Sequence, residues 1–204
     1  MRAIDLQGFD AKFVADADPW RTFSDRDEAR KRRAIVRGLG AAGRGRVLEL
    51  AAGNGSNSVA LARRALRLDA TEGTASGTAL IRRAVGDCPR IVVRRLVLPG
   101  RLPRTTYDAA VVAELLYYLS ARDMARVARD VAAALPVGGA LVLAHHRVDY
   151  PDFAQHAHGI HARFLAATGA AWRATNDNRT GRWRVQSYVR GSRSTRDPAN
   201  RTAP

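Results

Sequence analysis

The chain has 204 residues, of which 46% are hydrophobic and 26% are charged, and this is the composition of one folded domain with a sizeable core. No apolar run approaches the roughly 20 residues of a membrane span, and the first residues lack the apolar core of a signal peptide. Because Cys88 is the only cysteine, an internal disulfide is excluded and we expect a cytoplasmic protein.

The formal net charge of +15 would by itself favour an anionic partner such as nucleic acid. However, Lys12 and Lys31 are the only lysines among the 34 basic residues, which is typical of a high-GC coding bias. The charges are scattered, and no basic run alternates with aromatic residues as single-strand binders require. We therefore do not expect nucleic-acid binding.

Residues 1–40 are expected to form an N-terminal helical lid or cap. In the stretch Asp18-Pro19-Trp20, Pro19 favours a turn or a helix start. Trp20 either packs on the core or belongs to a lid over a ligand cavity, and the sequence leaves both open.

A helix is predicted over about residues 25–39. Ser24 and Asp27 resemble a capping box at its start. Its basic run, Lys31–Arg33, is expected to be a solvated face.

The stretch from Arg46 to Ser58 is the one around which the rest of the chain is organised. Val47–Leu50 predicts a buried strand, and Gly53 and Gly55 follow at the spacing of a tight turn. The next three residues, Ser56 to Ser58, offer N-cap side chains to a helix. Such a turn places backbone N–H groups around a small cavity that suits a carboxylate or a phosphate.

Glu49 is an acid inside the first strand, four residues before Gly53. Its burial is costly unless it meets a donor or a cation, and the ammonium group of S-adenosyl-L-methionine (AdoMet) would be such a cation. Glu49-x-x-x-Gly53-x-Gly55 resembles the first motif of class I AdoMet-dependent methyltransferases. The dinucleotide fingerprint G-x-G-x-x-G has glycine where Ser58 stands here, so an NAD-dependent oxidoreductase remains the alternative.

The second predicted strand, Leu66–Glu72, ends in an acid. Glu72 lies about 20 residues beyond Gly53, the interval expected for a ribose-binding acid. Asp69 competes for this role but lies inside the strand. Gly73 then allows close backbone approach, and a helix is expected over about 76–85.

The third predicted strand is Arg90–Arg94. Methyltransferases of this class often carry an acid just after it, near the adenine, and none follows here. Backbone groups, or apolar packing by Leu96 and Val97, would have to take its place.

The fourth predicted strand, Tyr107–Glu114, has the apolar centre of a buried parallel strand. Residues at strand carboxyl ends line the ligand crevice of an open α/β sheet. This predicts that Glu114, Tyr117 and Tyr118 lie near the reacting methyl group.

A helix capped by Ser120 is expected over about 120–135, followed by a fifth strand at Ala140–Ala144. All five histidines then fall between positions 145 and 161, with His158 and His161 on one face of a helix predicted over about 152–168. No acid or cysteine pattern supports metal-ligand spacing, so we expect no metal, and we expect His145 or His146 to line the pocket.

The end of the domain predicts an antiparallel hairpin. Strands at Ala171–Thr175 and Arg182–Tyr188 flank a turn-forming sequence, and we expect the hairpin to close the parallel sheet. Residues 191–204 are polar and are expected to be disordered.

Three stretches together resemble the nodulation protein S family: Asp18–Trp20, Leu48–Asn57 and Val112–Leu119. The resemblance implies a Rossmann-like α/β methyltransferase fold with helices on both faces of the sheet, formed by residues 41–190, and AdoMet as cofactor. The family's archetype N-methylates the free amine of a deacetylated glucosamine at the end of a chitin oligosaccharide. An amine of an amino sugar or glycan is therefore the implied acceptor, without a nodulation role following from it.

Two sets of residues are predicted to form the site. The cofactor set comprises Trp20, Glu49, Ala51, Gly53, Gly55, Asn57, Glu72, Gly73, Thr74 and Leu96. The acceptor set comprises Glu114, Tyr117, Tyr118, His145 and His146, in which the carboxylate gathers an ammonium and an imidazole takes its proton. A methyltransferase of another acceptor, such as RNA or a small molecule, and a binding module without activity remain alternatives.

Overall fold

The computed structural model describes residues 3–40 and 44–192. Most of the tail predicted to be disordered, from residue 193 on, lies outside the described residues. The helices are α1 (Leu6–Ala15), α2 (Arg26–Gly38), α3 (Ser56–Leu61), α4 (Ala75–Val85), α5 (Ala121–Ala134) and α6 (Ile160–Thr168), with a 3-10 turn η1 (Leu116–Tyr118). The strands are β1 (Arg44–Leu50), β2 (Ala65–Glu72), β3 (Ile91–Arg95), β4 (Ala109–Ala113), β5 (Ala140–His146), β6 (Trp172–Arg179) and β7 (Trp183–Arg190). None of the helices in these ranges is long and apolar enough to cross a membrane.

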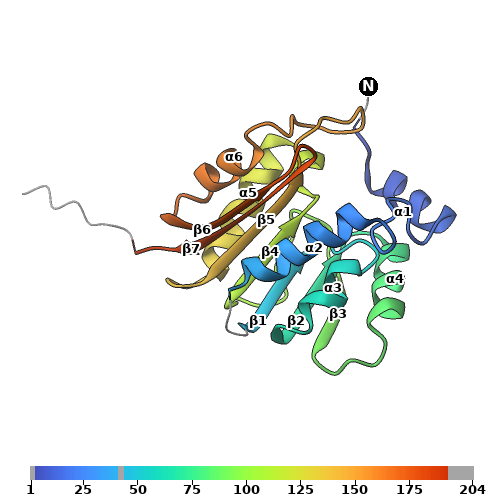
Figure 1. Cartoon of the computed structure of the whole chain (residues 1–204), viewed down its shortest axis with the longest axis horizontal. Helices are drawn as coiled ribbons and strands as arrows, with labels where there is room; N and C mark the ends of the chain where they lie inside the picture. The colour runs from blue at the N-terminus through green and yellow to red at the C-terminus, as the bar shows by residue number, and fades with distance from the viewer. Residues whose placement is uncertain (1–2, 41–43, 193–204) are drawn as a thin grey trace, which may run out of the picture.

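The strands form one seven-stranded sheet in the order β3-β2-β1-β4-β5-β7-β6 (Figure 1). The first five strands are parallel, and β7 pairs antiparallel with both β5 and β6. The predicted α/β fold with a C-terminal hairpin is therefore confirmed. One expectation was wrong, because the hairpin extends one edge, with β7 inside and β6 outside, and the sheet remains open.

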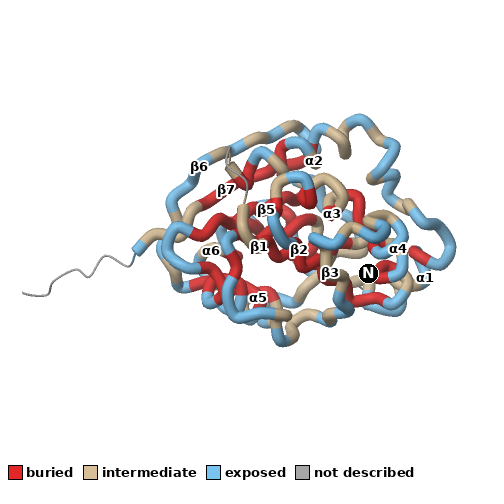
Figure 2. Tube along the Cα trace, turned by 90° about the horizontal axis from the view of Figure 1, so that it is seen from below, coloured by how far each residue is buried: buried red, intermediate tan, exposed pale blue. Residues whose placement is uncertain are grey.

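Helices cover both faces of the sheet, as expected (Figure 1). On one face, Ile35 of α2, Leu61 of α3 and Ile81 of α4 pack onto the strands. On the other face, Val127 of α5 and Phe164 of α6 do the same. The buried residues accordingly concentrate on the strands and the inner helix sides (Figure 2). Each fully buried side chain of this size contributes roughly 1.5–3 kcal/mol of burial free energy.

Helix α2 differs from its prediction in two respects. Its cap is Asp25 rather than Ser24, because the Asp25 carboxylate accepts the backbone N–H groups of Asp27 (2.6 Å) and Glu28 (3.2 Å). Lys31 is buried rather than solvated, since the helical period places it on the inner face with Ile35.

Three other boundaries were also predicted wrongly. Helix α3 starts after Gly55, whose φ is 86°, and has no side-chain cap, so the serines that follow do not cap it. Helix α6 starts only at Ile160, because the chain from 147 to 159 crosses the carboxyl edge of the sheet as a loop. Strand β6 continues to Arg179, through residues predicted to form the turn.

The two residues after β1 and β4 share an uncommon backbone conformation. Ala51 has φ 50° and Glu114 has φ 51°. The strands that precede them are neighbours, with Leu50 opposite Val112. Non-glycine residues in the left-handed region cost about 1–3 kcal/mol and cluster at functional sites. This strain therefore marks the crevice between β1 and β4, where the strand order reverses, as the candidate site.

Ala51→Gly is expected to raise the free energy of unfolding by about 1 kcal/mol, because relief of the positive-φ strain exceeds the added entropy of the unfolded chain. Urea denaturation followed by tryptophan fluorescence measures the change. Ala52→Gly is the matched control, and loss of a buried methyl group there should lower stability by about 1 kcal/mol. Equal destabilisation by the two variants would contradict the assignment of strain to Ala51.

Candidate functional site

Glu49 lies under the glycine turn with its carboxylate removed from water. The residue is 1% exposed, and one carboxylate oxygen, Oε2, accepts a hydrogen bond from Ser58 Oγ at 2.6 Å. The other oxygen, Oε1, is buried without a partner. Burial raises the pKa of Glu49 to about 8, against the opposing effect of the Ser58 hydrogen bond. An unsatisfied buried carboxylate oxygen is costly, so this position is suited to a cationic ligand group.

Glu72 joins the end of β2 to the glycine turn. Its Oε2 accepts the backbone N–H of Gly53 at 3.0 Å, and its Oε1 accepts the N–H (2.9 Å) and hydroxyl (3.0 Å) of Thr74. Burial raises the pKa of Glu72, although these donors act against it. Thr74 in turn caps α4 by accepting the N–H of Gly77. The carboxylate thus connects the end of β2 to the glycine turn and to the start of α4.

The other residues of the predicted cofactor set differ in their contacts and in how far they are buried. The N–H of Leu96 donates to the Glu72 carbonyl at 2.8 Å. A Cβ at Gly73 would lie 2.7 Å from a terminal methyl carbon of Leu6, so α1 approaches the backbone closely here. Asn57 lies partly exposed on the first turn of α3. Asp69, the competing acid, is instead buried in contact with Arg104 (3.0 Å).

The N-terminal segment is fastened to the glycine turn by a polar network that the sequence did not predict. Asn54 Nδ2 donates to Asp18 Oδ1 at 2.9 Å, and the Thr22 hydroxyl contacts both residues. Burial would raise the pKa of Asp18, but these hydrogen bonds and those from the Thr22 and Phe23 amides keep it below its usual value. The Asp of the Asp18-Pro19-Trp20 stretch, rather than its Trp, therefore contacts the turn.

Trp20 packs on α1 and is 39% exposed. Its ring lies 6.0 Å from that of Phe9 and 5.4 Å from that of Phe13. Phe13 in turn is the nearest side chain to Gly53, at 3.7 Å from where a Cβ would be. Trp20 thus supports α1 at the turn from outside the main core.

A cavity of about 210 Å³ remains between α1 and the end of β2. Its walls are Leu6, Gln7, Asp10, Gly73, Thr74, Ala75 and Arg95. Since Gly73 and Thr74 directly follow Glu72, this cavity adjoins the predicted ribose-binding acid.

Glu114 is the centre of the predicted acceptor site. Its Oε1 accepts from the Lys31 ammonium at 2.6 Å, and its Oε2 accepts from the Tyr117 hydroxyl and the His146 N–H. The Nε2 atom of His146 lies 3.9 Å from the same Oε2. Burial would raise the pKa of Glu114, but the charges of Lys31 and His146 hold it below its usual value.

Lys31 is a site residue that the sequence prediction missed. It is 3% exposed, and its ammonium lies 2.7 Å from Glu28 and 2.6 Å from Glu114. Burial would lower the pKa of Lys31, but the two carboxylates raise it above its usual value. The ammonium is therefore a permanent charge beside Glu114.

The two tyrosines occupy different depths. Tyr117 is buried, and its ring stacks on Phe153 with centroids 3.7 Å apart. Tyr118 is partly exposed and meets Phe9 of α1 edge-on at 4.8 Å. Phe153 lies in a segment predicted to be helical but observed as a loop, so the sequence gave no signal for this contact.

His145 is committed to a buried hydrogen-bond chain. Its Nε2 accepts the backbone N–H groups of Leu115 (3.3 Å) and Leu116 (3.1 Å), so its Nδ1 carries the proton and donates to His161 at 3.0 Å. His161 then donates to Gln186 at 2.9 Å. Burial lowers the pKa of His145 well below its usual value. The structure thus argues against His145 as an acceptor of substrate protons.

His146 is the histidine that faces the crevice. Its side chain is partly exposed, its Nδ1 lies 3.3 Å from the Arg182 carbonyl, and its Nε2 points at Glu114. Tyr150, whose ring centroid is 5.7 Å from that of the imidazole, covers its outer side. In the described residues no group of three or more His, Cys, Asp or Glu side chains is arranged to hold a metal ion.

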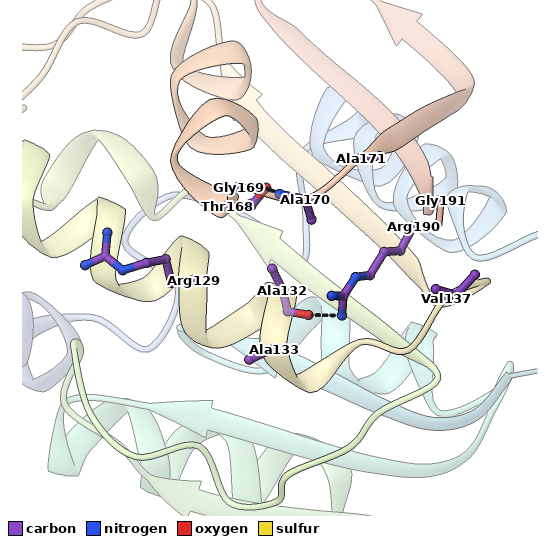
Figure 3. Close-up of a pocket in the computed structure, with 10 residues that line it drawn as sticks. All are labelled: Arg129, Ala132, Ala133, Val137, Thr168, Gly169, Ala170, Ala171, Arg190 and Gly191. Carbon is purple, nitrogen blue, oxygen red and sulfur yellow. Dashed lines mark hydrogen bonds between the residues drawn. The ribbon is translucent and has the colours of Figure 1, made fainter. Parts of the chain in front are cut away.

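A larger hollow, of about 430 Å³, lies beside α5, where the Arg190 side chain reaches Ala132 (Figure 3). It is formed where α5, α6 and β7 end, and its walls are Arg129, Ala132, Ala133, Val137, Thr168, Gly169, Ala170, Ala171, Arg190 and Gly191. The Arg190 guanidinium is already bound to the Ala132 and Leu135 carbonyls at the end of α5. This hollow lies away from the carboxyl ends of the five parallel strands and is not the candidate site.

No family model and no curated protein matches the sequence, whereas solved structures do match. A putative methyltransferase from Pseudomonas syringae is 26% identical over 81% of this chain and 100% of its own, with a TM-score of 0.69. The N-methyltransferase NodS from Bradyrhizobium japonicum WM9, in complex with S-adenosyl-L-homocysteine, is 18% identical over 92% of this chain and 98% of its own, with a TM-score of 0.78.

A third structure has the same fold and a different activity in its name. The [4+2]-cyclase SpnF is 14% identical over 80% of this chain and 82% of its own, with a TM-score of 0.64. Fold similarity alone therefore does not decide the reaction. The similarities show that the chain has the Rossmann-like fold of class I methyltransferases.

Proposed function

We propose that the protein is an AdoMet-dependent methyltransferase that N-methylates an amine of an amino sugar or a deacetylated glycan. The observation that carries the proposal is the buried Glu49 oxygen without a partner, below the glycine turn. A cation is the ligand group that best compensates such an oxygen. The amino group of a bound amino-acid moiety supplies that cation.

The residues present fit AdoMet at both ends of the crevice. Glu49 would hold the ammonium, and Glu72, fixed by Gly53 and Thr74, would accept from ribose hydroxyls. When bound, the cofactor supplies an electrophilic methyl group on a sulfonium, so the chain contributes position and a site shielded from water. The S-adenosyl-L-homocysteine in the NodS structure supports the same ligand class here.

NAD is disfavoured by the same residues. A dinucleotide brings a negatively charged pyrophosphate to the glycine turn, next to the buried Glu49 carboxylate, whereas Glu72 would suit the ribose of either cofactor. Moreover, Ser58, which stands where the fingerprint has its third glycine, is occupied in a hydrogen bond to Glu49.

At the acceptor end, His146 is the proposed catalytic base. An amine attacks only when unprotonated, and Nε2 of His146 can take its proton while the Glu114 carboxylate stabilises the resulting imidazolium. Glu114 accepts from Lys31, Tyr117 and the His146 amide, which makes it an orienting group for His146 rather than a free trap for the substrate ammonium. The exposed Tyr150 and the partly exposed Tyr118 offer ring faces to a sugar.

AdoMet affinity is expected to rise with pH up to about 8. With a pKa of about 8, Glu49 in the free protein holds a proton below that pH, and the ammonium requires the ionised form. Binding should therefore release up to one proton and tighten by at most about tenfold per pH unit below pH 8. Calorimetry in two buffers of different ionisation heat measures the released proton.

Glu49→Gln should weaken binding and abolish the proton release. Asp177→Asn, which removes an exposed carboxylate on β6, is the control and should keep both. Proton release that survives in Glu49→Gln would show that another group is responsible.

His146→Gln is expected to lower turnover by roughly 10²–10⁴-fold, the usual contribution of a general base, and to leave AdoMet affinity unchanged. Because an imidazolium cannot accept a proton, wild-type activity should fall on acidification and the variant should lose this dependence. His158→Gln, at an exposed histidine, serves as control. Wild-type turnover in His146→Gln would exclude the imidazole as the base.

The acceptor class is tested by AdoMet turnover against deacetylated chitin oligomers, free glucosamine, N-acetylglucosamine and RNA. We expect product only with the two substrates that carry a free sugar amine. Turnover of RNA alone, or cofactor binding without turnover of any acceptor, would overturn the acceptor assignment.

A further inference from the structure

Lys31 is brought into the site by a helix outside the strand–turn–helix core of the cofactor cavity. Helix α2 packs tightly on the sheet, because a Cβ at Gly38 would lie only 2.4 Å from Ser187 of β7 and 3.1 Å from Val142 of β5. Ile35 is fully buried against the same face. Lys31, one turn before Ile35, is consequently carried to a fixed position beside Glu114.

The Glu114 carboxylate separates two basic groups. Its Oε1 binds the Lys31 ammonium, whereas its Oε2 binds the Tyr117 hydroxyl and faces His146 Nε2 at 3.9 Å. A carboxylate beside an imidazole favours the imidazolium, and a nearby ammonium counteracts that effect. Lys31 on α2, His146 on β5 and Glu114 after β4 are thus close enough for each charge to affect the other two.

We propose that Lys31 is a positioning residue that sets how readily His146 accepts a proton, by compensating part of the negative charge of Glu114. The proposal rests on the proposed role of His146 as the base. Without Lys31, the imidazolium would be held too firmly to release its proton for the next turnover.

Other groups also face His146, and they too influence how readily it accepts a proton. Tyr150 meets the imidazole edge-on, Tyr117 donates to the Glu114 oxygen that His146 faces, and His145 is a neutral neighbour on the same strand. Arg147 follows His146, and its guanidinium is bound to the Thr180 carbonyl of the β6–β7 turn. Arg182 offers its carbonyl to the imidazole. These groups are the same in every variant below, so differences between variants report the Lys31–Glu114 pair.

The alternative is that Lys31 only stabilises the fold, as buried ion pairs often do. The two roles predict different results for the titration of the His146 ring, because a purely structural role would leave its pH midpoint unchanged. Lys31→Met should raise the pH midpoint at which the His146 ring titrates by about one unit, and Glu114→Gln should lower it by a similar amount. The double variant should return within a few tenths of a unit of wild type.

The experiment follows the five histidine ring signals by NMR across pH 5–9, with His146 assigned from the spectrum of His146→Gln. Lys31→Arg should keep the wild-type midpoint, since it keeps the charge. Lys12→Met, at the chain's other lysine, is the matched control and should also keep it. A midpoint unmoved by Lys31→Met, despite altered stability, would overturn the proposal.

Failure of Lys31→Met to fold would leave the test intact. Adding Lys31→Met to Glu114→Gln removes the ion pair as a whole, and the midpoint should rise relative to Glu114→Gln alone. The titration needs neither AdoMet nor acceptor. The proposal about Lys31 is therefore tested separately from the proposed function, which the turnover assays test.

Discussion

The candidate site depends on two acids at the ends of neighbouring parallel strands, of which Glu49 is buried and Glu114 is partly exposed. Glu49, near the end of β1, and Glu114, just after β4, flank the point where the strand order reverses. Each would be costly to bury alone, and the chain compensates them differently. Lys31 neutralises Glu114 from within, whereas one oxygen of Glu49 is left for a cation from outside. In the proposed function, this difference separates a preassembled acceptor side from a cofactor side that a ligand completes.

Prediction from sequence succeeded where local pattern decides position. Apolar runs placed every strand within a few residues, and the interval between Gly53 and Glu72 placed the acid at the end of β2. It failed where tertiary packing decides. The burial of Lys31 depends on which face of α2 meets the sheet and on a carboxylate 83 residues away. The stacking of Phe153 on Tyr117 likewise depends on a loop whose sequence has helical periodicity.

One feature of the composition nevertheless distinguishes Lys31 from the other basic residues. The chain uses arginine at nearly every basic position, and of its two lysines Lys31 is buried whereas Lys12 is exposed. The Lys31 ammonium binds Glu28 and Glu114 at the same time. The expectation that this basic run is a solvated face is therefore right for the exposed Arg33 and wrong for the buried Lys31.

Two of the clustered histidines, His145 and His161, belong to one buried hydrogen-bond chain. After β4 the backbone turns sharply at Glu114, and the N–H groups of Leu115 and Leu116 point into the protein, where each needs an acceptor. Nε2 of His145 accepts both, which fixes its tautomer and makes His161 and Gln186 the next members of the chain. Because burial keeps the pKa of His161 near 4 and that of His145 well below its usual value, the chain stays neutral at ordinary pH. His145 thus holds the strained turn that presents Glu114, which leaves its partly exposed neighbour His146 as the histidine to which we assign the proposed proton transfer.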